Sequence, residues 1–386
     1  MSKYSIIGLF CCAVFLQSCH KQRKAALPVV QAEVLAEIHM FAADTIPRTS
    51  ITFILGEDHS PYNQYYTLAN HYYRMNPDDK TEIVIDSLVS IKEVCEYLKM
   101  HPGKNDRPYG LINLVSHGNE FLDLRALVYP RGPRASVNAL LKAVQDSVIL
   151  PLDTLVLDER SLIYLHGCAV GNNQELLNSL ALAFGSKHNG VRVKASKLFE
   201  YYSYLSKNKN PQSIRHYFAK TWYAFYHPDS IPTSQGFVDR LTKRYPNDSV
   251  NWMEGVQRRF QSNPSEIYHF SFIVPAVWED LYEDESLVPS VNSRSKRKEW
   301  MDSRPDFTAM LNQTNIPLDY FHLMYYRPTY KRKSETFYGL RVRARAGVLC
   351  LIQPVLAEED SLRAQLVAYR PAEDDPDYFQ FSDVFE

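Results

Sequence analysis

The chain has 386 residues, of which 45% are hydrophobic and 23% charged, and its 43 basic residues balance 44 acidic ones. This length is enough for two domains, and the composition is that of a globular protein without extensive disorder. The near-zero net charge argues against a polyanionic partner, so we expect no nucleic-acid binding.

The first residues indicate export rather than part of the fold. Lys3 precedes an apolar run from Ile6 to Leu16, which is too short to span a bilayer and is typical of a secretory signal. The run ends in Leu-Gln-Ser-Cys at 16–19, which resembles the lipobox of bacterial lipoproteins. The resemblance implies removal of residues 1–18, a lipid on Cys19 that holds the protein at a membrane, and sorting to the outer membrane of a Gram-negative bacterium. An ordinary cleaved signal peptide is the alternative.

Three further cysteines follow Cys19 outside the signal, namely Cys95, Cys168 and Cys350. An exported chain with three such thiols has one left over. A disulfide between Cys95 and Cys350 would leave Cys168 free, and two buried unpaired thiols are the other possibility. We favour unpaired thiols because Cys95 lies on a predicted helix.

After a predicted tether at 19–49, short apolar runs alternate with amphipathic segments. This alternation of predicted strands and helices indicates βαβ units and a mostly parallel sheet. The predicted strands are Ile51–Leu55, Glu82–Ile85, the runs at 111–117 and 162–168, Val191–Lys197 and, as the sixth, Tyr217–Tyr226. The predicted helices are Tyr62–Met75, Ser90–Met100, Ala135–Ser147 and Asn173–Phe184.

The last third of the chain has a different pattern. After a helical segment at Gly236–Phe260, the stretch Tyr338–Ala344 alternates apolar residues with arginines, as in an antiparallel sheet with one solvated face. The other β-like runs are Ile267–Val274, Tyr320–Tyr326, Phe337–Gln353 and Gln365–Tyr369. We therefore predict an α/β domain at 50–230 and a helical connector with a smaller β-rich C-terminal domain at 231–386.

Two of the predicted strands end in a reactive side chain beside a glycine, His117–Gly118 in one and Gly167–Cys168 in the other. The carboxyl ends of parallel strands border the crevice in which open α/β sheets bind ligands. A thiol becomes a nucleophile as its thiolate, and a histidine can take up its proton. We predict Cys168 as nucleophile and His117 as base, with the amides of Gly118 and Cys168 directed at an oxyanion. A buried structural thiol is the alternative.

The arrangement resembles the caspase-like cysteine peptidases, which include caspases, legumains, gingipains, separases and CHAT-domain proteases. Their pattern is an apolar strand ending in His-Gly and, about fifty residues later, another ending in a small residue and Cys. Here the spacing is 168 minus 117, or 51 residues, and Gly167-Cys168-Ala169-Val170-Gly171 is most similar to the separase and CHAT forms. The resemblance covers roughly residues 48–230. It implies a caspase-like six-stranded sheet flanked by helices and a cysteine endopeptidase acting on a peptide or protein substrate without a cofactor.

The resemblance also suggests residues for specificity. Glu57 and Asp58 follow the first strand, in a region that often contributes to the primary pocket of relatives, and they would favour Arg or Lys before the cleaved bond. Helix capping by Asp58 competes with this role. Glu120 and Asp123 are alternatives. Trp222 lies on a strand whose counterpart lines that pocket in relatives, although core packing is the other explanation.

His166, two residues before Cys168, points to the same side of a regular strand, and it either assists the thiol or packs in the core. No HExxH, CxxC or glycine-rich phosphate motif occurs, so we expect no metal and no cofactor. The competing hypothesis is a catalytically silent lipoprotein that binds a protein or peptide in the same crevice.

Overall fold

The computed structural model describes residues 48–59, 63–75, 82–122, 124–204, 213–259, 266–332, 335–356, 371–372 and 374–383. All of these except Arg48 belong to one compact unit that begins at Thr49. The predicted signal peptide, most of the predicted tether and Cys19 lie outside the described residues, as do Asp123 and the β-like run at 365–369.

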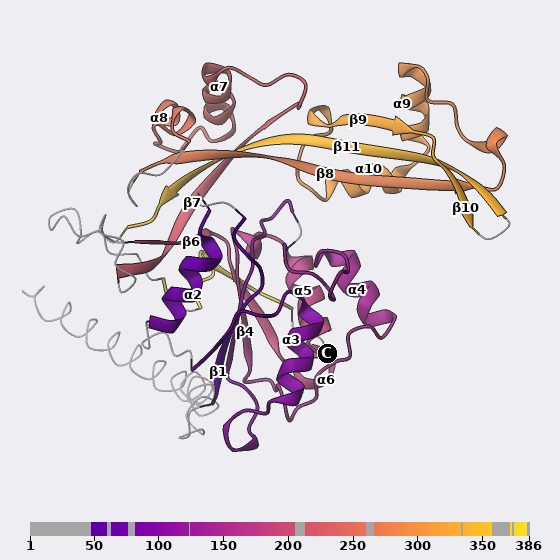
Figure 1. The fold of residues 1–386 in the computed structure, drawn as a ribbon. Coiled ribbons are helices and arrows are strands. Elements are labelled where there is room, and N and C mark those ends of the chain that lie inside the picture. The colour runs from indigo at the N-terminus through magenta and orange to yellow at the C-terminus, as the bar shows by residue number, and fades with distance from the viewer. Residues whose placement is uncertain are drawn as a thin grey trace, which may run out of the picture. The chain divides into compact units, whose positions relative to one another are not determined.

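Strands and helices alternate through the first part of this unit, and strands dominate the last part (Figure 1). The helices are α2 (Tyr65–Met75), α3 (Ile91–Met100), α4 (Val137–Gln145), α5 (Gln174–Ala183), α6 (Ser186–Asn189), α7 (Ser234–Arg244), α8 (Trp252–Gln257), α9 (Arg294–Asp302) and α10 (Pro305–Asn312). The strands are β1 (Ser50–Ile54), β2 (Ile83–Ile85), β3 (Leu111–Val115), β4 (Leu162–His166), β5 (Arg192–Ser196), β6 (Phe199–Tyr204), β7 (Ile214–Tyr226), β8 (Tyr268–Tyr282), β9 (His322–Tyr326), β10 (Thr329–Arg332), β11 (Glu335–Pro354) and β12 (Phe379–Phe381).

The first sheet has six strands in the order β12-β5-β4-β3-β1-β2. Five are parallel, and β12 pairs with β5 in the antiparallel direction, so a mostly parallel sheet of six strands is confirmed. Its sixth strand was predicted wrongly. The segment Tyr217–Tyr226 lies in β7 of the other sheet, and the edge position is taken by β12 from the C-terminal region.

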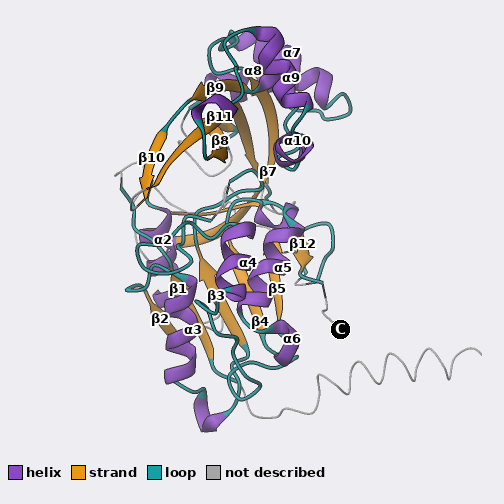
Figure 2. Ribbon diagram, turned by 90° about the vertical axis from the view of Figure 1, so that its right-hand side faces the viewer, coloured by secondary structure: helices purple, strands orange, loops and turns teal. Residues whose placement is uncertain are grey.

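The second sheet is antiparallel, with the order β10-β11-β7-β6, and β8 and β9 also pair with β11 (Figure 2). The strand β11 is 20 residues long and connects these partners. Along it, Leu340, Val342 and Ala344 are buried while Arg343 and Arg345 are exposed, which confirms the alternation read from the sequence. The buried face packs against α9 and α10 through Trp300 and Phe307.

One face of the parallel sheet is covered by α3, α4 and α5 (Figure 2). These helices start at capping side chains: Ser90 accepts from the Glu93 amide, Ser136 from the Ala139 amide and Asn173 from the Leu176 amide. The buried residues of α3 recur at helical spacing and include Val94, Cys95 and Leu98. Apolar residues on alternate positions of β1, β3, β4 and β5 complete this core.

The opposite face of the same sheet is polar at its centre. Thr52, Asn113, Tyr164 and Lys194 are paired in register across β1, β3, β4 and β5, and all four positions point away from the apolar core. Tyrosines of α2 and residues of β6 and β7 cover this face. Because buried polar groups need hydrogen-bond partners, this row requires polar residues on the covering elements.

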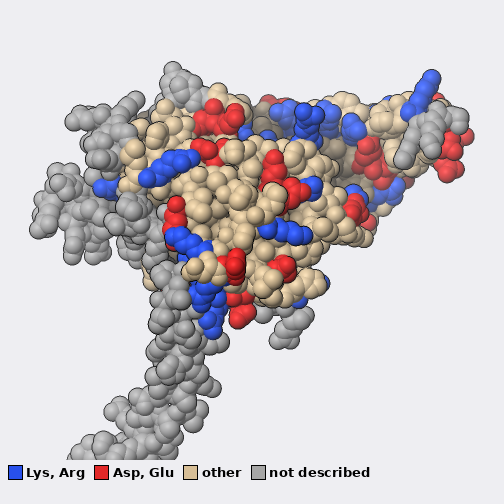
Figure 3. All heavy atoms as spheres, turned by 60° about the horizontal axis from the view of Figure 1, so that its bottom comes forward, with Lys and Arg blue, Asp and Glu red and all other residues tan. Residues whose placement is uncertain are grey.

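The remaining features concern thiols and the surface. Cys95, Cys168 and Cys350 are free and buried, as predicted for Cys95 and Cys350. On the face drawn in Figure 3, acidic and basic side chains of the described residues are interspersed. None of the described helices combines the length and apolar character needed to cross a bilayer.

Candidate active site

The two predicted catalytic segments lie side by side. Strands β3 and β4 pair in parallel, with Val115 opposite His166, and the pairing continues past the strand ends. The Ser116 amide donates to the His166 carbonyl at 3.0 Å, and the Cys168 amide donates to the Gly118 carbonyl at 3.0 Å. The sheet therefore delivers His117 and Cys168 to neighbouring positions at its carboxyl edge.

Two glycines allow the chain to turn sharply at this edge. A Cβ on Gly118 would lie 2.7 Å from a side-chain carbon of Leu124, and one on Gly171 would lie 2.6 Å from the backbone oxygen of Ala195. Ala169, directly after Cys168, adopts the left-handed conformation with φ of 58°. The turn after β4 is therefore packed closely onto its neighbours.

The thiol of Cys168 is enclosed. The residue is 8% exposed, and its sulfur lies 3.8 Å from the backbone oxygen of Glu200 on β6. Burial, followed by the nearby Glu200 carboxylate, raises the pKa of the Cys168 thiol, which is therefore protonated at neutral pH. The Cys168 amide, predicted as an oxyanion donor, is already bonded to the Gly118 carbonyl.

His117 is held by aromatic rings from the start of α2. Its imidazole stacks on Tyr65 with ring centroids 4.6 Å apart and meets the edge of Tyr66 at 4.7 Å. The Asn63 side-chain amide donates to its Nε2 at 3.3 Å. Burial, with a contribution from Arg125, lowers the pKa of His117 to about 4. The imidazole is therefore neutral at physiological pH and able to accept a proton.

Tyr65 joins the two segments. Its ring stacks on His117, and its hydroxyl donates at 3.2 Å to the carbonyl of His166, which lies two residues before Cys168. The His117 imidazole and the Cys168 thiol are therefore both uncharged at neutral pH. In this structure they do not form a thiolate–imidazolium ion pair.

The predicted specificity residues lie in different settings. Asp58 accepts hydrogen bonds from the Tyr66 amide at 3.2 Å and the Thr67 amide at 2.8 Å, so it caps the first turn of α2. It also acts electrostatically on His117. Glu57 is exposed.

Trp222 lies in the wall of a cavity of about 540 Å³ beyond the carboxyl ends of β3, β4 and β5. Its indole N–H donates to Asp248 at 2.8 Å, and its ring packs against Trp252. Glu120 lines the same cavity, and burial raises the pKa of its carboxyl group. His117 and Cys168 do not line it. Trp222 therefore both packs and borders a space near the predicted dyad.

No family model, no curated protein and no solved structure matches this chain.

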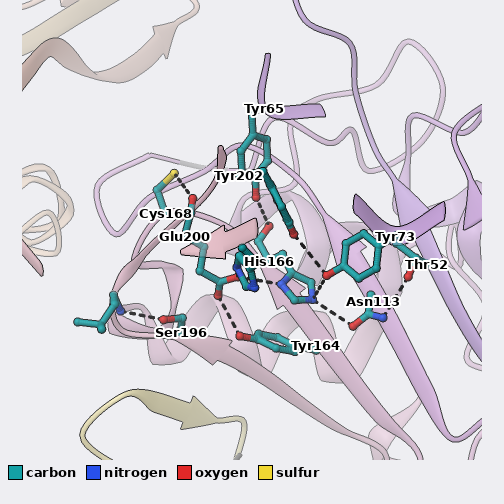
Figure 4. A network of polar contacts seen from close by, with 12 residues as sticks. Thr52, Tyr65, Tyr73, Asn113, Tyr164, His166, Cys168, Ser196, Glu200 and Tyr202 are labelled. Carbon is teal, nitrogen blue, oxygen red and sulfur yellow. Dashed lines mark hydrogen bonds and ion pairs between the residues drawn. The ribbon is translucent and has the colours of Figure 1, made fainter. Parts of the chain in front are cut away.

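A buried polar cluster behind Cys168 was only partly anticipated (Figure 4). His166 Nδ1 lies 2.8 Å from Glu200 Oε2, and His216 Nε2 lies 2.9 Å from the same oxygen. Tyr164 donates to the other Glu200 oxygen at 3.2 Å. Although burial opposes ionisation, the two histidines lower the pKa of Glu200 to about 2.

The sequence contained one signal for this cluster. The polar residues Thr52, Asn113, Tyr164 and Lys194 each follow an apolar residue at the same position of four short strands, and that alternation indicates a face covered by polar partners. Glu200 and His216 carry no comparable local signal because their partners come from another sheet.

Proposed function

We propose that this chain is a cysteine endopeptidase of the caspase-like type. The observation that supports the proposal most is the adjacency of the His117 and Cys168 segments at the carboxyl edge of one parallel sheet, with Tyr65 in contact with His117 and with the carbonyl of His166. The mixed six-stranded sheet with helices on its flank is in keeping with the expected architecture.

In the proposed reaction, His117 takes the proton from the Cys168 thiol as the sulfur attacks a peptide carbonyl. His117 then returns this proton to the departing amine, which leaves a thioester that water hydrolyses. The Gly118 and Cys168 amides stabilise the oxyanion. The Cys168 amide can do so only after the Gly118 carbonyl turns away from it. The attack also requires β6 to move away from the Cys168 sulfur.

The preference for Arg or Lys before the cleaved bond remains part of this proposal. Its support is the carboxylate of Glu57, which is exposed close to the edge at which β1 ends. A carboxylate there attracts the positively charged side chain of an Arg or Lys in the substrate, although salt screens the attraction between exposed charges.

A peptidyl acyloxymethyl ketone with a basic end residue tests the proposal on the full chain. We expect one labelled site that is lost in Cys168→Ala and retained in Cys350→Ala, which removes a second buried thiol. Labelling that persists in Cys168→Ala, or none with any peptide of a library, would contradict the peptidase.

The second candidate is a silent relative that binds a protein or peptide in the crevice. It is favoured by the enclosure of the Cys168 sulfur beneath β6 and by the engagement of its amide. The labelling experiment separates the two, because a silent relative stays unlabelled while it retains peptide binding.

We also propose export and lipid attachment at Cys19, with the outer membrane as destination. The support is the Leu-Gln-Ser-Cys sequence after a short apolar run. Metabolic labelling with radioactive palmitate tests this. We expect incorporation that is lost in Cys19→Ser and retained in Cys12→Ser.

A further inference from the structure

Two imidazoles converge on one carboxylate oxygen in the interior of the protein. His166 is on β4, Glu200 on β6 and His216 on β7, so the cluster joins the parallel sheet to the antiparallel one. The side chains of His166 and Glu200 are 3% and 0% exposed, and that of His216 is 13% exposed. The three ligand atoms all lie within 4.8 Å of one another.

The neighbours of His166 determine what can lie between it and Glu200. The Asn113 amide nitrogen donates to the Thr52 hydroxyl at 3.0 Å, which turns Asn113 Oδ1 toward His166 Nε2 at 3.0 Å. The Tyr73 hydroxyl lies 2.9 Å from the same Nε2 and can donate or accept there. In the tautomer in which Nε2 holds the proton and donates it to Asn113 Oδ1, Nδ1 presents a lone pair to the Glu200 carboxylate 2.8 Å away. That tautomer directs a nitrogen and an oxygen lone pair at one point, where a cation can bind.

We propose that His166 Nδ1, Glu200 Oε2 and His216 Nε2 bind a zinc ion. Two imidazole nitrogens and a carboxylate oxygen are a ligand set that zinc favours, and three protein ligands leave one position for water. Zinc bonds of about 2.0–2.1 Å in tetrahedral geometry separate ligand atoms by about 3.3 Å. Glu200 Oε2, now 2.8 and 2.9 Å from the two imidazole nitrogens, needs to move only about half an ångström further from each, and the two nitrogens lie within 4.8 Å of one another.

The groups around the three ligands also fit a metal site. Metal-binding histidines usually donate their second N–H to an acceptor, and ligating carboxylates are themselves hydrogen-bonded. Asn113 Oδ1 fills the first role for His166, and the Tyr164 hydroxyl fills the second for Glu200. These contacts orient the ligands before an ion arrives (Figure 4).

An ion here would fix β6 over the candidate nucleophile. The backbone oxygen of Glu200 lies 3.8 Å from the Cys168 sulfur, so a bond from the Glu200 side chain to zinc holds the strand that covers the thiol. Removing zinc would then increase the reaction of Cys168 with iodoacetamide. This consequence does not depend on peptidase activity, so the zinc proposal and the proposed function can fail separately.

Zinc itself is the probe, added to the full chain after treatment with a chelator. We expect one tightly bound zinc per chain by elemental analysis, a higher melting temperature with zinc, and affinity at least tenfold weaker in Glu200→Gln and His216→Gln. The partly exposed His216 provides a variant for the case in which Glu200→Gln does not fold. Circular dichroism checks the fold of each.

Two controls locate the ion. Glu279→Gln removes an outer carboxylate that pairs with Arg341, and it should leave zinc binding unchanged. His322→Gln disrupts a second group of potential ligands, His227, Asp229 and His322, and should also leave it unchanged. Zinc binding that is lost in His322→Gln would overturn the proposal. So would a wild-type protein that binds no more zinc than Glu200→Gln. If the two proteins bind zinc equally, the cluster of His166, Glu200 and His216 holds protons only.

Discussion

His117 makes stability depend on pH because its imidazole is buried in the neutral form. Its pKa is about 4 in the folded protein against an ordinary value of 6.5. As the pH falls from 6.5 towards 4, the unfolded chain binds the proton and the folded chain does not, so the free energy of unfolding decreases. At about 1.4 kcal/mol per pKa unit, this loss is at most about 3.5 kcal/mol and levels off below pH 4.

Urea unfolding at pH 7.5, 5.5 and 4.5 measures this dependence. We expect a shallower decrease in His117→Gln than in the natural protein, since only the latter loses the contribution of this histidine. His188→Gln is a suitable control because His188 is an exposed histidine on α6. Equal slopes in the natural protein and His117→Gln would show that His117 is not held neutral by burial.

Asp58 provides a second test at the level of one residue, because it caps α2. Losing a capping side chain costs about 1 kcal/mol, so we expect Asp58→Ala to lower the free energy of unfolding by this amount. Asn also caps helices well, so Asp58→Asn should lose much less. Glu57→Gln, at an exposed position, serves as the control, and urea midpoints give the values. A similar midpoint for Asp58→Ala and Glu57→Gln would exclude the capping role.

At the scale of elements, β12 shows what a local pattern leaves undetermined. The segment Phe379–Phe381 has only three residues, yet it pairs with β5, and the Phe379 ring lies 3.8 Å from the Lys194 ammonium nitrogen. We expect Phe379→Ala to lower the free energy of unfolding by about 3 kcal/mol, as for other buried phenylalanines. Asp374→Ala, an exposed change five residues before β12, should have little effect. Chemical denaturation compares them, and equal stability would mean that β12 is not docked in solution.

The sequence predicted the strands that carry His117 and Cys168 because each is a short apolar run ending at polar residues and glycine. Their adjacency followed from the order expected of βαβ units. The sequence did not predict the partner strand of Tyr217–Tyr226, because a buried aromatic strand has the same residue pattern in a parallel and in an antiparallel sheet. His166 was singled out, but Glu200 and His216 were missed, because their place beside it depends on which strands of two sheets meet.

At the scale of the whole molecule, the strand pairing links the two predicted domains. The strand β7 lies before the predicted boundary at 230, but residues 219–226 pair with β11, far beyond it. In the opposite direction, β12 returns from the C-terminal region to complete the parallel sheet. Each half of the chain therefore contributes strands to a sheet that the other half needs.

A fragment of residues 49–230 tests this interdependence. Without β11 it exposes the edge of β7 and the buried side chains of Trp222 and Tyr223, and without β12 it uncovers Lys194. Unpaired strand edges and exposed aromatic surface favour aggregation, so we expect the fragment to lack a cooperative thermal transition and to elute as aggregates. Residues 49–386 should unfold in one transition. A monomeric fragment with a sharp transition of its own would instead establish two independent domains divided near residue 230.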